Sequence, residues 1–219
     1  IDDFIKNYEI NKTVITVLHQ NKEFSIQKVK EFRFDECQKE AIHRLIIDRL
    51  SLITGYPGSG KTDILDCVCK YLYENLDYKN ICLTTPTATA TKVLVNRCTF
   101  NKKKEINYNL FKLLYDVFPK IEESLRKNDI EKNTELEQYQ KSLKDYDERE
   151  IRDLIEKQKD KLFFGDIFLP NVIVLDESSM VDLRLFYKLI RFCIKFNIKL
   201  ILSGDSNQLP PISGGNPFL

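Results

Sequence analysis

The sequence contains no tryptophan and one methionine, and glycine and proline are sparse, with seven of each in 219 residues. It has no apolar run near the roughly 18 residues that a membrane-spanning helix needs, so we expect no membrane segment. None of the six cysteines forms a Cys-x-x-Cys pair, which excludes zinc sites built on that spacing. The chain also lacks a strong net charge, since its formal net charge at pH 7 is only +1. Any polyanion must therefore be bound by a local groove and not by the surface as a whole.

What is present fits an α/β protein with a sizeable core, since 42% of the residues are hydrophobic and 31% are charged. Most cysteines stand in apolar stretches, which favours a reducing intracellular compartment, the cytoplasm or the nucleus. Abundant Lys, Asn and Ile favour an AT-rich genome, such as that of a virus or a protist. The chain begins at Ile1 and ends in a Gly/Pro-rich stretch, so we expect a piece of a longer polypeptide.

Residues 1–34 form an N-terminal extension in this interpretation. Two β-prone runs, 13–18 and 24–29, predict a hairpin or the end of an upstream domain. Residues 35–219 form the main domain, which opens with a helix over 35–50 that Asp35 caps. Apolar strands then alternate with helices, which predicts a parallel sheet with helices on both faces. The expected strands are 50–54, about 80–85, 172–175 and 199–205, and the expected helices are 63–76, the stretch up to 98, and 181–196.

Residues of about 120–161 interrupt this pattern with a charged segment that mixes both signs. Apolar residues recur at helical spacing, so we expect a helical insertion of one or two exposed amphipathic helices. Such a segment is either a solvated arm or a surface that binds a protein partner.

Polar signals follow each expected strand at its carboxyl end. They are Gly55, Thr84-Thr85-Pro86, Asp176-Glu177 and Gly204-Asp205. Ligands of open parallel sheets bind at this edge, so these four segments should meet around one ligand.

The first of them, Gly55–Thr62, matches the phosphate loop G-x-x-x-x-G-K-[ST] between a strand and a helix. Backbone N–H groups and the helix N-terminus would bind the phosphates, Lys61 would reach the β- and γ-phosphates, and Thr62 would coordinate Mg²⁺. The alternative is a glycine-rich turn that matches by chance. The expected ATP-binding residues are Gly55, Pro57, Gly58, Ser59, Gly60, Lys61 and Thr62.

Asp176 and Glu177 fit the second half of a nucleotide hydrolase. Asp176 can hold Mg²⁺, and Glu177 can act as general base on the attacking water. The alternative is a pair that caps a helix beginning near Val181. Gln208 offers an amide that can touch both the γ-phosphate and the water, unless its segment is an ordinary loop.

The stretches CQKEAI, LITGYPGSGKT, LTTPTATATKVL, VIVLDESSMVD and LILSGDSNQLPPISGGNPF together resemble the first motor domain of superfamily 1 DNA helicases, in the RecD-like and Pif-type branch. The resemblance covers roughly residues 35–100 and 170–219. It implies a RecA-like P-loop NTPase fold, an ATP-dependent 5′→3′ DNA helicase, and ATP with Mg²⁺ as cofactors.

The same resemblance implies roles for single residues. Gln38 matches the glutamine that binds adenine, and Asp205 with Gln208 matches the element that couples nucleotide state to DNA. The implied partners are single-stranded DNA and a second RecA-like domain of the same polypeptide, which supplies arginine fingers. Without that second domain, the isolated chain should be nearly inactive. The expected DNA contacts are Thr85, Pro86, Thr87, Thr91 and Lys92.

Two other functions remain open at this stage. One is an RNA helicase of the same superfamily, since similar Gly-Asp-x-x-Gln elements occur there. The other is a nucleotide-dependent binding module without turnover, in which the helical insertion recruits a protein partner.

Overall fold

Four parallel strands form the central sheet of the computed structural model, in the order β3-β8-β7-β4. Residues 1–12, 14–20, 23–100, 107–123, 163–164, 167–205, 207–208, 210–211 and 215 are described. Parallel register places the last residues of the strands at one edge, with Thr54 opposite Gly204 and Thr84 opposite Leu175. The strands are β3 (Leu50–Thr54), β4 (Ile81–Thr84), β7 (Val172–Leu175) and β8 (Lys199–Gly204).

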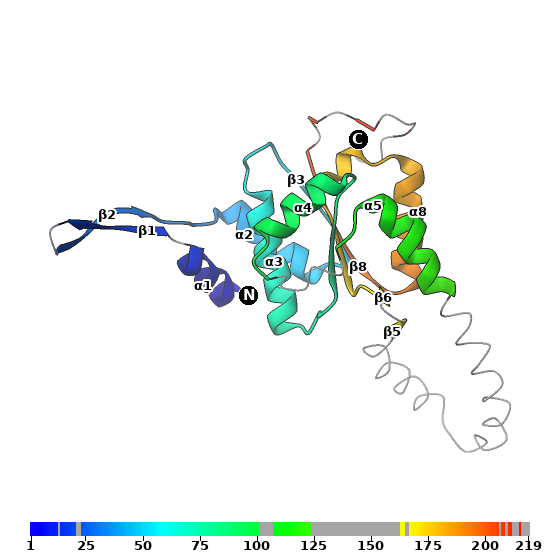
Figure 1. The fold of residues 1–219 in the computed structure, drawn as a ribbon, viewed down its shortest axis with the longest axis horizontal. Coiled ribbons are helices and arrows are strands. Elements are labelled where there is room, and N and C mark those ends of the chain that lie inside the picture. Colours follow the sequence, from blue (N-terminus) through cyan, green and yellow to red (C-terminus); the bar gives the residue numbers. More distant parts are fainter. Residues whose placement is uncertain are drawn as a thin grey trace, which may run out of the picture.

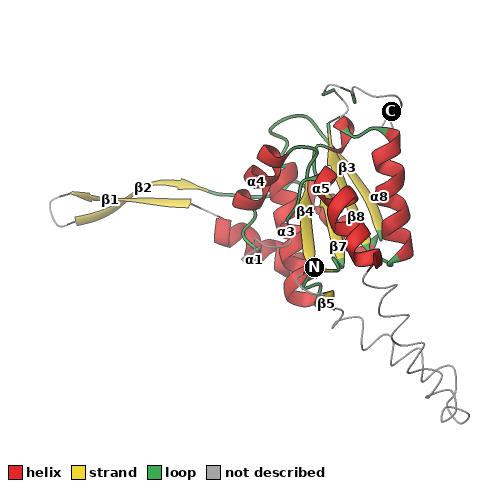
Figure 2. Cartoon of the chain, turned by 45° about the vertical axis from the view of Figure 1, so that its right-hand side comes forward, coloured by secondary structure: helices red, strands yellow, loops and turns green. Residues whose placement is uncertain are grey.

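Helices cover both faces of this sheet (Figures 1 and 2). Alternate strand residues point to opposite faces, so Leu83 packs into one core with the first helices and Cys82 into another with the last one. The predicted α/β fold, with helices on both faces of a parallel sheet, is confirmed. On the first face lie α2 (Glu36–Ile47), α3 (Lys61–Asn75) and α4 (Ala88–Arg97), and on the second lie α5 (Leu110–Lys112), η2 (Leu113–Val117) and α8 (Leu183–Lys195).

Side-chain caps set where several of these helices begin, α2 and α8 among them. As the sequence predicts, Asp35 caps α2 and accepts a hydrogen bond from the Gln38 N–H. The Gln38 side chain in turn accepts one from the Asp35 N–H, which completes a capping box. Helix α8 begins at Leu183, two residues after Val181 near which the sequence predicts its start, because Asp182 caps it. A 3₁₀ turn, η3 (Ser178–Met180), separates it from the sheet. The Asp176-Glu177 pair therefore does not cap α8.

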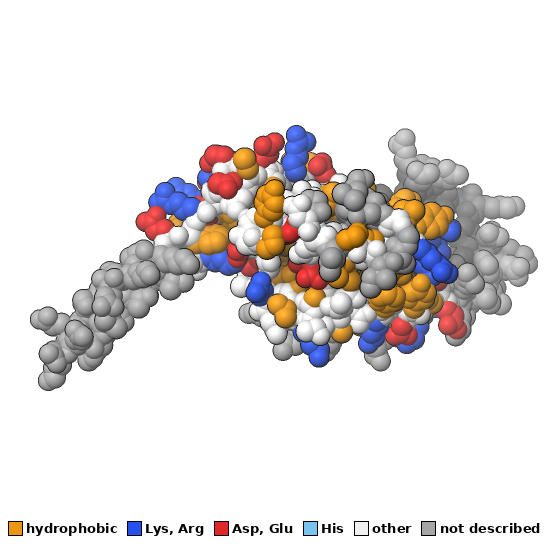
Figure 3. All heavy atoms as spheres, turned by 90° about the horizontal axis from the view of Figure 1, so that it is seen from above, with side chains coloured by type: hydrophobic (Ala, Val, Ile, Leu, Met, Phe, Trp, Pro, Cys, Tyr) orange, Lys and Arg blue, Asp and Glu red, His pale blue; other side chains and the backbone are white. Residues whose placement is uncertain are grey.

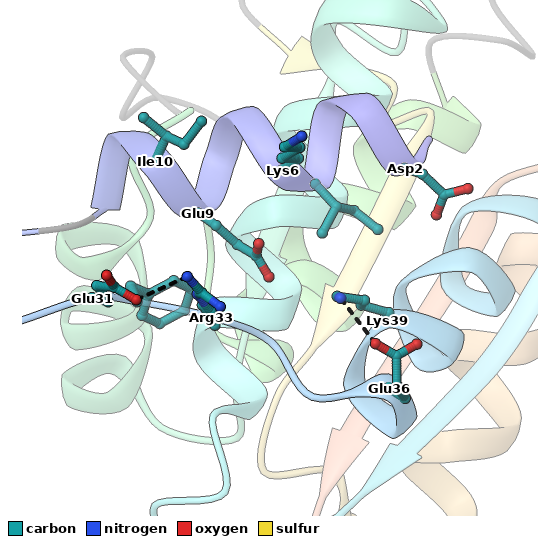
Figure 4. Close-up of a pocket in the computed structure, with 10 residues that line it drawn as sticks. Asp2, Lys6, Glu9, Ile10, Glu31, Arg33, Glu36 and Lys39 are labelled. Carbon is teal, nitrogen blue, oxygen red and sulfur yellow. Dashed lines mark hydrogen bonds and ion pairs between the residues drawn. The ribbon is translucent and has the colours of Figure 1, made fainter.

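The N-terminal segment joins the first core through a helix that the β-prone runs do not reveal. Helix α1 (Asp2–Lys12) buries Ile5 and Tyr8 in the core shared with α2 and α3. The β-prone runs pair as an antiparallel hairpin, β1 (Val14–Gln20) and β2 (Glu23–Lys30), which extends away from the sheet in Figure 1. A cleft of about 790 Å³ lies between α1 and the start of α2, lined by charges of both signs (Figure 4). A domain boundary at residue 34 stays a prediction.

The predicted helical insertion lies mostly outside the described residues, since 124–162 are not among them. Just before it, the helical segment of α5 and η2 continues to Glu123. Just after it, β5 (Phe163–Phe164) pairs with β6 (Ile167–Phe168) as a short antiparallel ladder. In the described part of the chain, no helix combines the length and the apolar character needed to cross a membrane.

Five of the six cysteines are buried and behave as small apolar side chains, as predicted. Burial raises the pKa of the Cys67 and Cys193 thiols to about 12, so neither is a reactive thiolate at neutral pH.

Candidate nucleotide-binding site

The phosphate loop leaves β3 and enters α3 through two glycines in the left-handed region. Gly58 has φ 79° and Gly60 has φ 84°, and Gly60 stands directly before the first residue of α3. A side chain would be strained at either position. The Ser59 N–H donates to the Tyr56 carbonyl at 3.2 Å, which closes the loop. The loop thus leads directly into a helix N-terminus that is suited to bind phosphate.

Two side chains hold this loop. The Lys61 ammonium donates to the carbonyl oxygen of Gly55 and to that of Tyr56, the second at 3.0 Å. The Gln38 amide donates to the Ser59 carbonyl at 3.0 Å. Gln38 is therefore anchored on the phosphate loop, although it does not line the cleft described below. Its assignment to adenine stays a prediction.

A short hydrogen-bond network fixes the carboxylate of Asp176 at the end of β7. Its Oδ1 accepts from the Ser203 hydroxyl at 2.7 Å and from the Glu177 N–H at 3.0 Å. Ser203 is fully buried in β8, and its carbonyl accepts from the Ser178 hydroxyl at 2.8 Å. Strands β7 and β8 thus orient the carboxylate together.

Glu177 follows with φ 56°, a left-handed conformation that is uncommon for a residue other than glycine. Such backbone strain persists where the surrounding structure enforces it, often at functional sites. Burial, and then the Asp176 charge, raise the pKa of Glu177 above its ordinary value. A carboxylate with a raised pKa is a better proton acceptor, which suits a general base.

Gln208 is placed by a turn that begins at Asp205. The buried Asp205 carboxylate accepts from the Asn207 N–H at 2.9 Å, and the Asp205 carbonyl accepts from the Gln208 N–H at 3.1 Å. The Asp205 side chain is thus used to build the turn. Gln208 itself is exposed and lines the cleft.

One cleft of about 570 Å³ brings the catalytic candidates together. Hydroxyl and carboxylate oxygens suit Mg²⁺, which takes few protein ligands and completes its shell with phosphates and water. Thr62 and Asp176 therefore fit a magnesium ion. Among the described residues, no group of three or more His, Cys, Asp or Glu side chains could hold a metal ion by itself. The cleft contains Lys61, Thr62, Asp176, Glu177 and Gln208, with Pro57, Gly58 and Gly60 of the loop.

The predicted DNA contacts are divided by burial. Thr85 and Thr91 are buried, and their hydroxyls bond to each other at 2.9 Å and to the Thr87 carbonyl. DNA could reach these two hydroxyls only if those bonds opened. Thr87 and Lys92 are exposed and Pro86 is partly exposed, and none of them lines the cleft.

Sequence reasoning missed several residues of the site, among them Ser203 and Arg97. Ser203 orients Asp176, and Arg97, from the last turn of α4, lines the cleft. A serine inside an apolar strand was the available signal for the first. An arginine near the end of a helix carries no such signal, because its side chain is usually solvated.

Comparison with known proteins places this geometry in a family. The family model described as AAA domain matches residues 38–214. The chain belongs to the AAA-domain family. This match runs from Gln38, through the phosphate loop and the Asp-Glu pair, to the turn that carries Gln208.

Curated relatives extend the AAA-domain assignment. The RecBCD enzyme subunit RecD of Buchnera aphidicola from Schizaphis graminum is 27% identical, over 83% of this chain and 26% of the relative. Its counterpart from Acyrthosiphon pisum is 28% identical over 97% and 31%. An uncharacterised protein of Methanocaldococcus jannaschii is 28% identical over 84% and 13%. The resemblance to the RecD-like branch is confirmed. The chain spans less than a third of the length of each of these relatives.

Two solved structures resemble the AAA-domain chain in part. One is Pif1 of Bacteroides sp in complex with ADP-AlF4, with 20% identity and a TM-score of 0.43. The other is the Pif1 helicase from Candida albicans, with 18% identity and the same TM-score. Each comparison covers 82% of this chain and 34% of the other.

Proposed function

We propose that this chain is the first motor domain of an ATP-dependent DNA helicase, which couples ATP hydrolysis to 5′→3′ movement along single-stranded DNA. The observation that carries the proposal is the convergence of Lys61, Asp176 and Gln208, from three separate segments, on one cleft. The similarity to relatives named RecBCD enzyme subunit RecD supports the helicase class. The polarity and the preference for DNA rest on the resemblance of the motifs to the RecD-like branch.

In this proposal the cleft binds the triphosphate at the N-terminus of α3. Lys61 exchanges the carbonyls of Gly55 and Tyr56 for phosphate oxygens. Thr62 and Asp176 would hold Mg²⁺, and the ion would supply positive charge that offsets the negative charge of the phosphates. Glu177 accepts a proton from the attacking water, and Gln208 orients that water through its amide.

Complete catalysis needs a second RecA-like domain, which the proposal places in the same polypeptide. An arginine finger contributes about 10³–10⁵ in rate in related phosphoryl transfers. The 219-residue chain alone should therefore bind nucleotide and hydrolyse it very slowly. In the polypeptide that holds both domains, single-stranded DNA should accelerate hydrolysis.

The test compares that polypeptide with its Gln208→Ala variant. ATP binding and DNA binding should persist in the variant, while DNA-stimulated hydrolysis falls. Undiminished stimulated turnover would count against the coupling role of Gln208. Stronger stimulation by single-stranded RNA than by DNA would favour the RNA helicase instead. No hydrolysis at saturating Mg²⁺-ATP and DNA would favour a binding module.

A further inference from the structure

The exposed face of α8 carries a row of cations. Arg184, Lys188, Arg191 and Lys195 recur every three or four residues, so they lie on one side of the helix. Arg184 and Arg191 are exposed, and neither forms an ion pair with a described residue. Lys195 pairs with Glu122 at 2.8 Å. Positive charge therefore remains in excess along this face.

The helical segment of α5 and η2 lies beside this row and adds aromatic rings. The Lys188 ammonium lies 3.9 Å from the centre of the Tyr115 ring, which stacks on Phe111 at 6.3 Å. Tyr115 is 51% exposed and Phe111 52%. On α8 itself, the Arg191 guanidinium lies 5.7 Å from the centre of the Tyr187 ring, which is 59% exposed. Large aromatic surfaces thus remain open beside the cations.

Between the two helices runs a groove of about 780 Å³. Its floor is rigid, since Phe118 of the η2 segment stacks on Phe192 of α8 with ring centres 3.4 Å apart. In Figure 3, blue Lys and Arg side chains lie among hydrophobic ones on the side where Figure 1 shows α5 and α8. We name this feature the basic–aromatic groove. It comprises the lining residues Arg184, Tyr187, Lys188, Arg191 and Lys195, together with Tyr115 and Phe111, which lie beside the groove at Lys188.

We propose that the basic–aromatic groove binds a single-stranded nucleic acid. Sites of this kind combine cations for the phosphates with aromatic rings on which bases stack. The cation row from Arg184 to Lys195 spans about 16 Å along the helix axis, at about 1.5 Å per residue. At about 3.4 Å per nucleotide, that length accommodates about five nucleotides. An acidic protein segment would use the charges but would not need the exposed stacked rings.

This site is distinct from the DNA contacts of the proposed function. Those contacts precede or lie on α4, which packs on the first face of the sheet, whereas α8 and η2 pack on the second. The groove also contains none of the residues that line the nucleotide cleft. Binding of nucleic acid in the groove should therefore need neither ATP nor its hydrolysis. The groove can be tested independently of the proposed motor activity.

The experiment measures binding of the 219-residue chain to a fluorescein-labelled oligothymidylate by anisotropy, without nucleotide. In the Lys188→Gln/Arg191→Gln variant, affinity at low salt should fall about tenfold or more. The plot of log affinity against log salt should become shallower by about 1.4, because a single strand gives about 0.7 per neutralised phosphate. The matched control, Lys6→Gln/Arg44→Gln, changes two exposed cations elsewhere and should leave both values unchanged.

A second variant tests the rings. Tyr115→Ala should weaken binding about fivefold or more on the oligothymidylate. The loss should vanish on an abasic strand of equal length, which keeps the phosphates and lacks the bases. The surface position of Tyr115 keeps the fold intact, which circular dichroism checks.

Three results would overturn the proposal. The first is unchanged affinity in the Lys188→Gln/Arg191→Gln variant. The second is an equal loss on normal and abasic strands in Tyr115→Ala. The third is displacement of the oligonucleotide by polyglutamate at equal charge concentration, which would assign the groove to an acidic protein partner.

Discussion

Ser203 fixes the orientation of the Asp176 carboxylate through one partly buried hydrogen bond of 2.7 Å. Groups that orient a metal ligand typically contribute 10- to 100-fold to metal affinity. In Ser203→Ala, the Mg²⁺ concentration that half-saturates nucleotide binding should rise about tenfold. Titration of Mg²⁺ against a fluorescent ATP analogue measures it.

The matched control is Ser51→Ala, which removes a buried hydroxyl in β3 that donates to the Asp48 carbonyl at 3.3 Å. Its Mg²⁺ requirement should equal that of the unchanged protein. A similar rise in both variants would mean that Ser203 acts through general stability and not on Asp176.

Lys199 is a buried cation at the start of β8, 4% exposed, whose ammonium donates to the carbonyls of Ile46 and Asp48. Burial lowers the pKa of Lys199 to about 8, from an ordinary 10.5. Between these values the unfolded chain binds a proton that the folded chain lacks, so this group makes stability rise with pH across that window. At about 1.36 kcal/mol per pKa unit, the rise is at most about 3 kcal/mol.

Comparison with Lys199→Met isolates this contribution, because the cysteines titrate over part of the same range in both proteins. The unfolding free energy of the unchanged protein, minus that of the variant, should increase between pH 8 and pH 10.5. Urea denaturation at several pH values measures it. A difference that stays flat or falls would contradict the lowered pKa.

At the residue scale, the sequence predicted the site residues that belong to a strong sequence motif and missed those whose motif is weak. Lys61, Thr62, Asp176, Glu177 and Gln208 lie in one cleft because each follows a strand whose carboxyl end reaches the same edge. The burial of Thr85 and Thr91 could not be foreseen, because it depends on how α4 turns back onto the end of β4. The hydrogen bonds of Ser203 depend likewise on the pairing of β7 with β8.

At the scale of elements, α1 is tied to the phosphate-loop helix by a buried carboxylate. Asp66 of α3 is 1% exposed and accepts from the Tyr8 hydroxyl at 2.7 Å and from the Thr99 N–H at 2.6 Å. In Tyr8→Phe, one bond to this buried charge is lost, so the unfolding free energy should fall by about 1–3 kcal/mol. Chemical denaturation measures the change.

Tyr71→Phe is the matched control, because the Tyr71 ring packs on Phe4 at 5.1 Å and its hydroxyl has no hydrogen bond to a described residue. It should change stability by less than about 0.5 kcal/mol. Equal losses in Tyr8→Phe and Tyr71→Phe would contradict the role of the Asp66 bond.

The strand and helix order was predictable because apolar strands and helical periodicity are local signals. For α2, the cap at Asp35 also marked where the helix begins. Helix α1 was not predicted, since only Ile5 and Tyr8 mark its buried face and both contact residues distant in the chain. The helical segment of α5 and η2 was not predicted, for a related reason. Its apolar side is defined by packing against α8, which follows it by some seventy residues.

At the scale of the whole molecule, two hydrophobic cores lie on opposite faces of one sheet, and each supports a different site. The first holds α1, α2, α3 and α4, which build the phosphate loop and the wall of the nucleotide cleft. The second holds the η2 segment and α8, which form the basic–aromatic groove. The carboxyl edge of the sheet, between the two cores, carries Asp176 and leads to Gln208. A structural change at this edge can therefore be transmitted to the helices on both faces of the sheet.

The most direct measurement is calorimetric titration of the 219-residue chain with a non-hydrolysable ATP analogue and Mg²⁺. The account predicts one site, and affinity should fall about tenfold or more in both Lys61→Ala and Asp176→Asn, because each loses an interaction with a charged group. Lys6→Ala, an exposed lysine of α1, should bind as the unchanged chain does. Equal affinity in all four proteins, or no binding by the unchanged chain, would contradict the account.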